Sequence, residues 1–244
     1  RIEQSYIAEN NLALLGEIIS GTVDRNGVLW CGTRRNGLVR FDPRTESIEN
    51  YLPPNKNKNL SHYGRIGHVA IDSQNNIWCT NRTQGVYCFD TNKKKFRHYL
   101  PNDQTGFPLP AGAYTLLIDK NDKIWCGTND GLLYFDPIKD GFIKVDFLNG
   151  GIQSGPSIFS INQSQNGELL LGTFQKGLFI YNPVTQAVRN LRNNDGLPND
   201  MVRFTIEDEF GDIWLSTQNN LCRYNRTTKQ IKMFGSDDGV PDFQ

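Results

Sequence analysis

The sequence predicts an all-β protein of the β-propeller type, built from four-stranded antiparallel blades. One pattern recurs five times at intervals of 44 to 48 residues: an acidic residue, a tight turn, an aliphatic residue with Trp, a small-polar pair, Gly-Leu, and an aromatic residue with Asp or Asn. A period in the forties with one Trp per unit is typical of a propeller or a solenoid. The anchor positions are Trp30, Trp78, Trp125, Leu170 and Trp214.

Each repeat is expected to contain four short strands and no helix. In the second copy we expect strands at residues 67–71, 76–80, 85–89 and 95–99, where β-branched and aromatic residues are frequent. The turn between the first two strands has Gly, Asn or Asp at one position, and these residues tolerate the positive φ of a primed hairpin turn. The five turn residues are Gly27, Asn75, Asp122, Gly167 and Gly211.

Four antiparallel strands in about 46 residues make one propeller blade. A solenoid is the alternative, but its β-rich units usually hold about 20–30 residues and one strand each. Because one blade cannot bury both of its apolar faces, neighbouring blades must stack. We expect the recurring tryptophans to fill the space between them, as structural residues of the repeat. They are Trp30, Trp78, Trp125 and Trp214.

The repeats divide the chain into one propeller domain of about five blades. Residues 1–16 resemble the outer strand of a preceding blade with its linker, and the linker at 194–200 recurs at 237–242. These ends suggest a piece of a larger array, although five repeats can also close as a five-bladed ring. The expected blades are 17–62, 63–110, 111–154, 155–199 and 200–244, the last with the start of the next linker.

Composition narrows the class of partner. The chain of 244 residues has 26 Lys and Arg and 26 Asp and Glu, so its charge gives no reason to expect nucleic acid or an anionic membrane. No apolar run approaches the roughly 20 residues of a membrane span, and the first ten residues lack the apolar stretch of a signal peptide. The cysteines are expected to be small buried side chains, because no CxxC motif supports a zinc site. They are Cys31, Cys79, Cys88, Cys126 and Cys222.

No catalytic motif is present in the sequence. The histidines are His62, His68 and His98, and the chain has no HExxH, Gly-x-Ser-x-Gly or phosphate-loop pattern. An aspartate before each turn can accept backbone N–H groups, so we expect a turn-capping role rather than paired-carboxylate catalysis. We therefore predict no catalytic residue, no metal and no cofactor. The aspartates are Asp24, Asp72, Asp119 and Asp208 before the first turn, and Asp42, Asp90 and Asp136 before a later one.

Over residues 17–244 the repeats resemble those of the two-component regulator propeller family. The unit of that family reads roughly acidic-x-x-Gly-x-(Ile/Leu)-Trp-x-Gly-Thr, then Gly-Leu and aromatic-Asp-Pro. The first copy matches this unit from Asp24 to Thr33, then at Gly37-Leu38 and Phe41-Asp42-Pro43. Segment 195–198 is similar to the segment between blades in the family. The departures are Thr80-Asn81 and Ser216-Thr217 in place of Gly-Thr, and Leu170 in place of Trp.

The resemblance implies a function that composition and spacing do not show. Propellers of this family typically form the periplasmic sensor region of membrane-bound hybrid histidine kinases. Two seven-bladed rings usually precede a β-sandwich, a membrane helix and the kinase. The resemblance implies a non-enzymatic, periplasmic sensor fragment whose ligand is a carbohydrate breakdown product. The implied partners are an oligosaccharide, a second copy in a homodimer, and the sandwich, membrane and kinase domains in cis.

Function is expected where the repeats differ, in loops at one end of the blades. The loops between second and third strands carry Arg, Gln, Asn and Lys, and the connections into the first strands add aromatic rings and further Arg residues. These side chains suit sugar hydroxyls, carboxylates and ring faces. The expected ligand-binding residues are Arg34, Arg35, Tyr63, Arg65, Arg82, Tyr114, Phe174, Lys176 and Arg203.

Two other classes of function remain open from the sequence. The propeller can be an interaction or dimerisation platform with no ligand of its own. It can also be a glycan lyase or hydrolase, which would need a constellation of His, Tyr or carboxylate residues unique to one blade. The sequence shows no such constellation.

Overall fold

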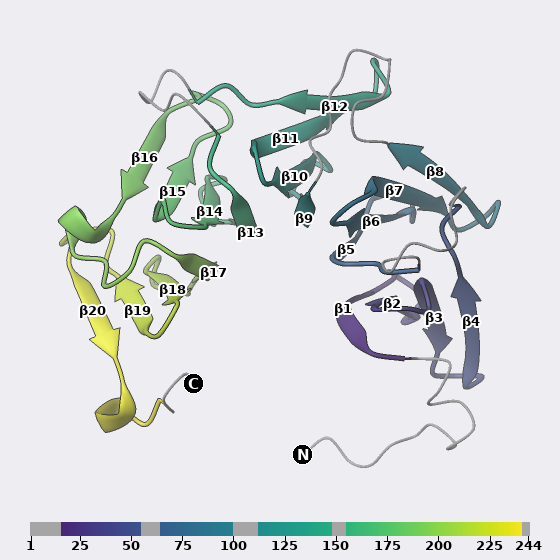
Figure 1. Cartoon of the computed structure of the whole chain (residues 1–244), viewed down its shortest axis with the longest axis horizontal. Helices are drawn as coiled ribbons and strands as arrows, with labels where there is room; N and C mark the ends of the chain where they lie inside the picture. Colours follow the sequence, from purple (N-terminus) through teal and green to yellow (C-terminus); the bar gives the residue numbers. More distant parts are fainter. Residues whose placement is uncertain (1–15, 55–63, 100–111, 148–154, 241–244) are drawn as a thin grey trace. The chain divides into compact units, whose positions relative to one another are not determined.

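The computed structural model describes residues 16–54, 64–99, 112–147 and 155–240. These residues form five four-stranded antiparallel sheets, each made of four strands consecutive in the chain and adjacent in that order (Figure 1). Apart from the strands, the described ranges contain short 3-10 turns. The predicted all-β class with four-stranded antiparallel units is confirmed. The chain divides into two compact units, residues 1–118 and 119–244.

The first unit holds two complete sheets and the first strand of a third. The first sheet consists of β1 (Ile18–Val23), β2 (Leu29–Thr33), β3 (Leu38–Asp42) and β4 (Ser47–Tyr51). The second sheet consists of β5 (Val69–Ile71), β6 (Ile77–Asn81), β7 (Gly85–Asp90) and β8 (Lys95–Tyr99). Strand β9 (Ala113–Ile118) contacts β5 and β6, and β1 contacts β5. The first strands of successive sheets are therefore neighbours in this unit.

The second unit begins with the remaining strands of the third sheet, which are β10 (Ile124–Thr128), β11 (Gly131–Asp136) and β12 (Gly141–Lys144). The fourth sheet consists of β13 (Ile158–Gln163), β14 (Leu169–Thr173), β15 (Leu178–Tyr181) and β16 (Val188–Leu191). The fifth consists of β17 (Val202–Glu207), β18 (Ile213–Thr217), β19 (Leu221–Tyr224) and β20 (Ile231–Phe234). The 3-10 turns η2 (Asn193–Asp195) and η3 (Ser236–Asp238) follow β16 and β20.

The turn between the first two strands has the same backbone geometry in every repeat. The predicted turn residue has a positive φ in all five copies, as expected for Gly, Asn or Asp. The prediction of a primed turn is wrong, because the two central residues of each turn have no positive φ. The N–H of the turn residue instead donates to the carbonyl three residues earlier, as in a type I turn followed by a left-handed residue. The φ angles are 77° at Gly27, 67° at Asn75, 62° at Asp122, 87° at Gly167 and 82° at Gly211.

In four repeats, the aspartate before this turn binds both the turn and the tryptophan that follows it. Asp119 Oδ1 accepts hydrogen bonds from the backbone N–H groups of Asn121 at 2.8 Å and Lys123 at 3.0 Å. Its Oδ2 accepts from Trp125 Nε1 at 2.8 Å. The predicted turn-capping role is confirmed, and we call the added indole–carboxylate bond the Asp–Trp pair. The other pairs are Asp24–Trp30 at 3.2 Å, Asp72–Trp78 at 2.8 Å and Asp208–Trp214 at 2.8 Å.

Tryptophan rings held in this way pack against the next sheet of the same unit. The ring centroid of Trp30 lies 6.1 Å from that of Tyr51 in its own sheet and 5.7 Å from that of Phe89 in the second sheet. In the second unit, Trp125 lies 6.2 Å from Tyr181 of the fourth sheet. Both tryptophans are buried. In these two repeats the tryptophan ring therefore occupies the space between adjacent sheets.

The glycine of the Gly-Thr pair lies where the next sheet comes closest. A Cβ atom at Gly32 would stand 2.6 Å from the carbonyl oxygen of Gly67, and one at Gly172 would stand 2.8 Å from that of Val202. Both distances are shorter than a carbon–oxygen contact allows, and these backbone atoms cannot swing aside as the nearby side chains of Ile66 and Ser160 can. Glycine at these positions therefore sets the spacing between adjacent sheets.

Removing the Trp125 ring tests its packing role. We expect Trp125→Ala to lower the free energy of unfolding by about 3–5 kcal/mol, because it leaves a cavity between two sheets. Trp125→Phe keeps most of the packing but leaves the buried Asp119 carboxylate without its indole donor, at a cost of about 1–3 kcal/mol. Urea denaturation followed by circular dichroism measures both. A smaller loss of unfolding free energy in Trp125→Ala than in Trp125→Phe would contradict the packing role of the ring.

Acid is expected to weaken the turn after β3. Hydrogen bonds from Arg44, helped by its charge and by Arg40, lower the pKa of Asp42 to about 2 despite an opposing effect of burial. Because the unfolded pKa is about 3.9, this stabilising contribution is complete above about pH 4 and is lost as the pH falls toward 2. We expect the urea midpoint to fall across this window and to depend less on pH in Asp42→Asn. An unchanged pH dependence in that variant would exclude the role of Asp42.

Candidate functional site

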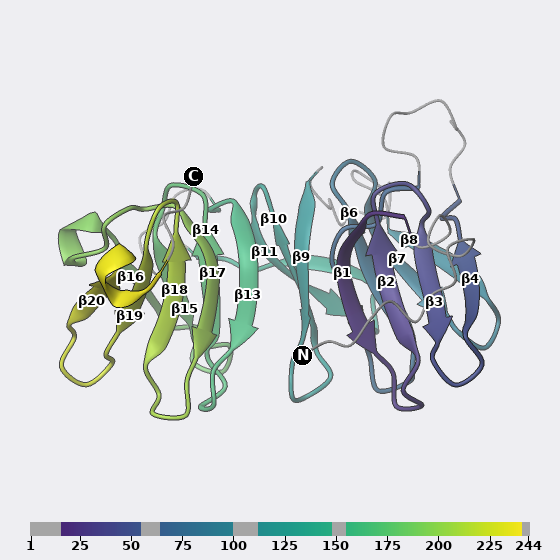
Figure 2. The ribbon, with the colours of Figure 1, turned by 90° about the horizontal axis from the view of Figure 1, so that it is seen from below.

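The predicted ligand-binding residues follow the second strand of a sheet, or lie just before or at the start of a first strand. In an antiparallel sheet these places share one end, because the second strand ends where the first begins. In the second unit β13 contacts β17, and the two first strands lie side by side in Figure 2. The loops before them therefore gather at the end that also holds the β14–β15 and β18–β19 turns.

In the first unit, the structure brings together two of the predicted residues. The guanidinium carbon of Arg82 lies 4.9 Å from the ring centroid of Tyr114, in cation–π geometry. Arg82 is exposed on the β6–β7 turn, and Tyr114 is half-buried in β9. Asn81 fixes the turn, since its Oδ1 accepts from the backbone N–H of Gln84 and its Nδ2 donates to the Arg65 carbonyl at 2.6 Å. Arg82, Tyr114 and the Arg65 backbone thus belong to one small surface.

The remaining predicted residues of the first unit are more separate. Arg34 is exposed and forms an ion pair with Glu17, with 2.9 Å between Nη2 and Oε1. Because both side chains are more than half exposed, this pair contributes little stability. Arg35 is also exposed, and the Nε atom of the half-buried Arg65 has no hydrogen-bond partner among the described residues. Tyr63 lies outside the described residues.

In the second unit, an aromatic pair stands among the predicted residues. Phe174, on the turn after β14, is 40% exposed, and its ring centroid lies 5.6 Å from that of Phe159 in β13. The backbone N–H of Phe174 donates to the Ser157 carbonyl, which ties this turn to the start of β13. Lys176 is half-buried near the same turn, and Arg203 is exposed on β17. The exposed Phe174 ring and these cations could contact a ligand bound at this end.

The described histidines have structural roles. His68 Nδ1 accepts a hydrogen bond from the backbone N–H of Leu116 at 3.1 Å, which links the second sheet to β9. Burial lowers the pKa of His68, so it is neutral at pH 7 and can accept this bond. The ring of His98 stacks on Tyr87 with centroids 4.1 Å apart, and burial also lowers its pKa. His62 lies outside the described residues.

The cysteines behave largely as predicted. All five thiols are free, and four are buried, whereas Cys88 is only half-buried. Burial raises the pKa of Cys222 to about 11 and that of Cys79 and Cys126 still further, so these thiols stay protonated. Among the described residues, no group of three or more His, Cys, Asp or Glu side chains is placed to hold a metal ion.

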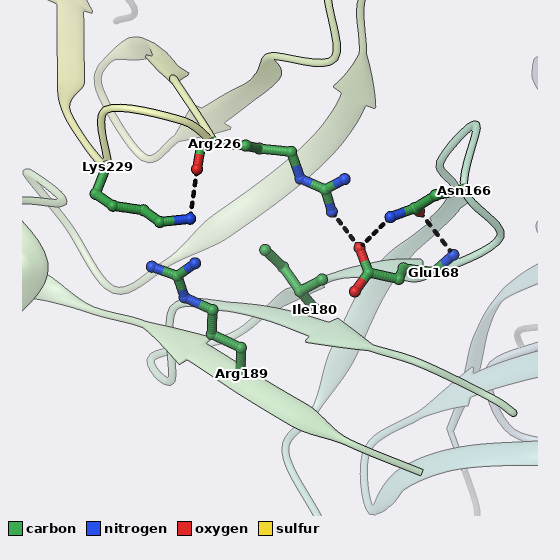
Figure 3. Close-up of a pocket in the computed structure, with 6 residues that line it drawn as sticks. All are labelled: Asn166, Glu168, Ile180, Arg189, Arg226 and Lys229. Carbon is green, nitrogen blue, oxygen red and sulfur yellow. Dashed lines mark hydrogen bonds and ion pairs between the residues drawn. The ribbon is translucent and has the colours of Figure 1, made fainter. Parts of the chain in front are cut away.

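Sequence reasoning missed a pocket in the second unit. A cavity of about 290 Å³ lies between the fourth and fifth sheets, toward the end opposite to the loops just described (Figure 3). The sequence contained one signal for it, because Leu170 of the fourth sheet stands where tryptophan is expected. The lining side chains gave no further signal in the sequence, since they are ordinary polar and apolar residues of two repeats. We call this cavity the basic pocket; its lining residues are Asn166, Glu168, Ile180, Arg189, Arg226 and Lys229.

Comparison with protein-family models finds no match for this chain. Among curated proteins, it is 27% identical over 135 residues to histidine kinase P4 of Formosa agariphila, a match that covers 52% of this chain and 9% of the kinase. Among solved structures, it resembles the extracellular domain of a hybrid two-component system from B. thetaiotaomicron, with a TM-score of 0.72 and 20% identity. That likeness covers 89% of this chain and 30% of the other.

The resemblance to propellers of two-component regulators is confirmed, because relatives in both comparisons are two-component proteins. The chain spans less than a third of the length of either relative, so it corresponds to only part of such a protein. Its structural relatives among two-component systems are extracellular domains. Among the described residues, no helix has the length and apolar character that a membrane crossing needs.

The same fold also occurs in an enzyme. An inactive variant of virginiamycin B lyase from Staphylococcus aureus, crystallised with quinupristin, matches with a TM-score of 0.70 and 14% identity. The match covers 95% of this chain and 73% of the lyase. Identity at this level shows the fold alone, so function has to be argued from particular side chains rather than from the architecture.

The contact between Arg82 and Tyr114 can be measured directly. We expect a double-mutant cycle with Arg82→Ala and Tyr114→Ala to give a coupling energy of about 0.5–1 kcal/mol, as for a partly exposed cation–π contact. Urea denaturation of the parent, both single variants and the double variant supplies the four values. Additive losses would show that the two side chains do not interact in solution.

Proposed function

We propose that this chain is a ligand-recognition region of an extracytoplasmic, periplasmic sensor of the hybrid histidine kinase type. We further propose that it responds to a carbohydrate breakdown product. The kinase relative and the extracellular structural relatives support the sensor class. The carbohydrate is supported by the chemistry of the loops, where guanidinium groups and aromatic faces stand together.

The observation that carries the proposal is the Arg82–Tyr114 contact. A sugar presents a flat apolar face and a rim of hydroxyl or carboxylate groups, and it binds where an aromatic ring and a fixed donor are adjacent. Arg82 lies over Tyr114 at 4.9 Å, on a turn that Asn81 holds in place. The exposed Phe174 ring beside Phe159 offers a second stacking surface in the other unit.

The packing of the sheets limits how such a sensor can work. The buried tryptophans and the close glycine contacts leave little room for movement within a unit. A ligand can shift a conformational equilibrium only by its difference in affinity for the two states. We therefore propose that ligand binding changes contacts between this region and other domains of the parent protein, including a second copy and the downstream sandwich, and leaves the sheets unaltered.

Isothermal titration calorimetry of the 244-residue chain against defined oligosaccharides tests the proposal. The probes are neutral xylo-oligosaccharides and acidic oligogalacturonides of two to six sugars. We expect at least one probe to bind to the parent chain. Tyr114→Ala and Phe174→Ala are then titrated with that probe. At least one of these variants should weaken binding about tenfold, which corresponds to ~1.4 kcal/mol. Arg25→Ala, an exposed cation at the opposite end of its sheet, is the control and should bind as the parent does.

Three results would overturn the proposal in different ways. Binding that neither aromatic variant weakens would place the ligand elsewhere on the chain. No heat with any probe, together with a concentration-dependent dimer in sedimentation, would favour an interaction platform. Shortened oligosaccharide products after incubation would show an enzyme instead.

A further inference from the structure

The fourth repeat lacks both members of the Asp–Trp pair. Ser164 occupies the position of the aspartate, and Leu170 that of the tryptophan six residues later. Ser164 still caps the turn, because its Oγ contacts Asn166 Oδ1 at 2.5 Å and the Glu168 carbonyl at 3.0 Å. The turn is therefore kept, while the indole ring and its carboxylate partner are lost together.

In the first and third repeats, the indole ring fills the space in front of the next sheet. Trp30 packs on Phe89, and Trp125 packs on Tyr181, which are aromatic residues at or next to the end of the third strand of the following sheet. The equivalent residue after the fourth repeat is Tyr224, which packs in one cluster with Leu170. Leu170 and Tyr224 are both buried in this cluster, but the leucine side chain is smaller than an indole and leaves a gap in front of Ile180.

Strand pairing shows which side chains border this gap. Leu170 is paired with Ile180 in the neighbouring strand, and Ile180 is paired with Arg189 in the next. Directly paired residues project from the same face of a sheet. The three side chains therefore form a row on one face of the fourth sheet, and the guanidinium carbon of Arg189 lies 5.4 Å from the ring centroid of Tyr224 in the fifth.

The basic pocket opens at this gap. Its volume of about 290 Å³ lies at the lower limit of small-molecule sites, which start near 300 Å³. Figure 3 shows Ile180 in the middle, with Arg189 and Lys229 on one side and Arg226 with Glu168 on the other. Ile180 is 5% exposed and supplies an apolar base. The hydroxyl of the buried Tyr224 has no hydrogen-bond partner among the described residues.

The charges around the pocket are not balanced. Arg226 is neutralised by two carboxylates, because Nη2 lies 2.5 Å from Glu168 Oε2 and Nη1 lies 3.1 Å from Glu207 Oε1. No described carboxylate forms an ion pair with Arg189 or Lys229, and the ammonium group of Lys229 donates to the backbone carbonyl of Arg226. Arg189 and Lys229 thus stand beside an apolar base without an ion-pair partner among the described residues, and the five charged groups sum to a net positive charge.

We propose that the basic pocket binds a small carboxylate that carries a ring, with the ring in the space left by the missing indole. The ring would lie against Ile180, and the carboxylate would meet Arg189 and Lys229. A guanidinium group binds a carboxylate through two parallel hydrogen bonds, which favours Arg189 as the main partner. This site is independent of the loop surface that carries the proposed sensor function.

Nuclear magnetic resonance titration of the 244-residue chain tests this proposal with four probes. Benzoate represents an aromatic acid, glucuronate a sugar acid, benzamide a ring without charge, and sulfate a charge without a ring. We expect benzoate or glucuronate to shift the amide signals around Ile180 and Arg189. Which of the two acids causes the shift shows whether the ring of the ligand is aromatic or a sugar. Benzamide and sulfate should bind at least about tenfold more weakly. No shift with either acid, or equal binding of sulfate, would overturn the proposal.

Variants locate the site. Arg189→Gln and Lys229→Gln should each weaken acid binding severalfold, whereas Arg25→Gln, an exposed cation in the first unit, should leave it unchanged. The double variant Ser164→Asp with Leu170→Trp restores the pair found in the other repeats and should abolish binding while keeping the melting temperature. Binding that survives in this folded variant would overturn the assignment. If the double variant does not fold, unchanged acid binding in both Arg189→Gln and Lys229→Gln would also overturn the assignment of the site.

Discussion

The Asp–Trp pair is the interaction on which the described structure depends most. One carboxylate closes a hairpin turn through backbone N–H groups and, in the same geometry, orients an indole ring six residues later. Orienting the ring determines how the next sheet can pack, because the next aromatic residue lies directly against it. A local turn and a contact between sheets are therefore coupled through a single side chain, which explains why the two residue types recur together.

Much of the fold could be predicted from the sequence because its signals are local and repeated. The positive φ at Asn75 and Asp122 and the burial of Trp125 follow from residue type and spacing. The candidate site could be predicted only as a set of loops, since which loop residues meet depends on distances between sheets. Arg82 meets Tyr114, whereas Arg34 is paired with Glu17. The basic pocket was missed because it arises from an absent ring rather than from a motif.

The two candidate sites differ in how the repeat generates them. At the loop end, Arg82 and Phe174 lie on turns between second and third strands, where the residue type differs from repeat to repeat. The basic pocket instead replaces a packing element, because Leu170 stands in the row that the other repeats use to cover the next sheet. A repeat architecture can thus acquire binding sites by changing the side chains on its turns or by omitting one buried side chain. The second route exchanges stability for a cavity whose position is set by the neighbouring repeats.

The buried thiols have a practical consequence for studying this protein. Cys31, Cys79, Cys126 and Cys222 lie in four different sheets, and each is shielded from solvent without a disulfide partner. An alkylating reagent can reach such a group only when its own sheet separates from its neighbours, so the labelling rate reports the opening of that sheet. The chain thus contains four native reporters of local opening, and mass spectrometry could rank its sheets by resistance without any engineered probe.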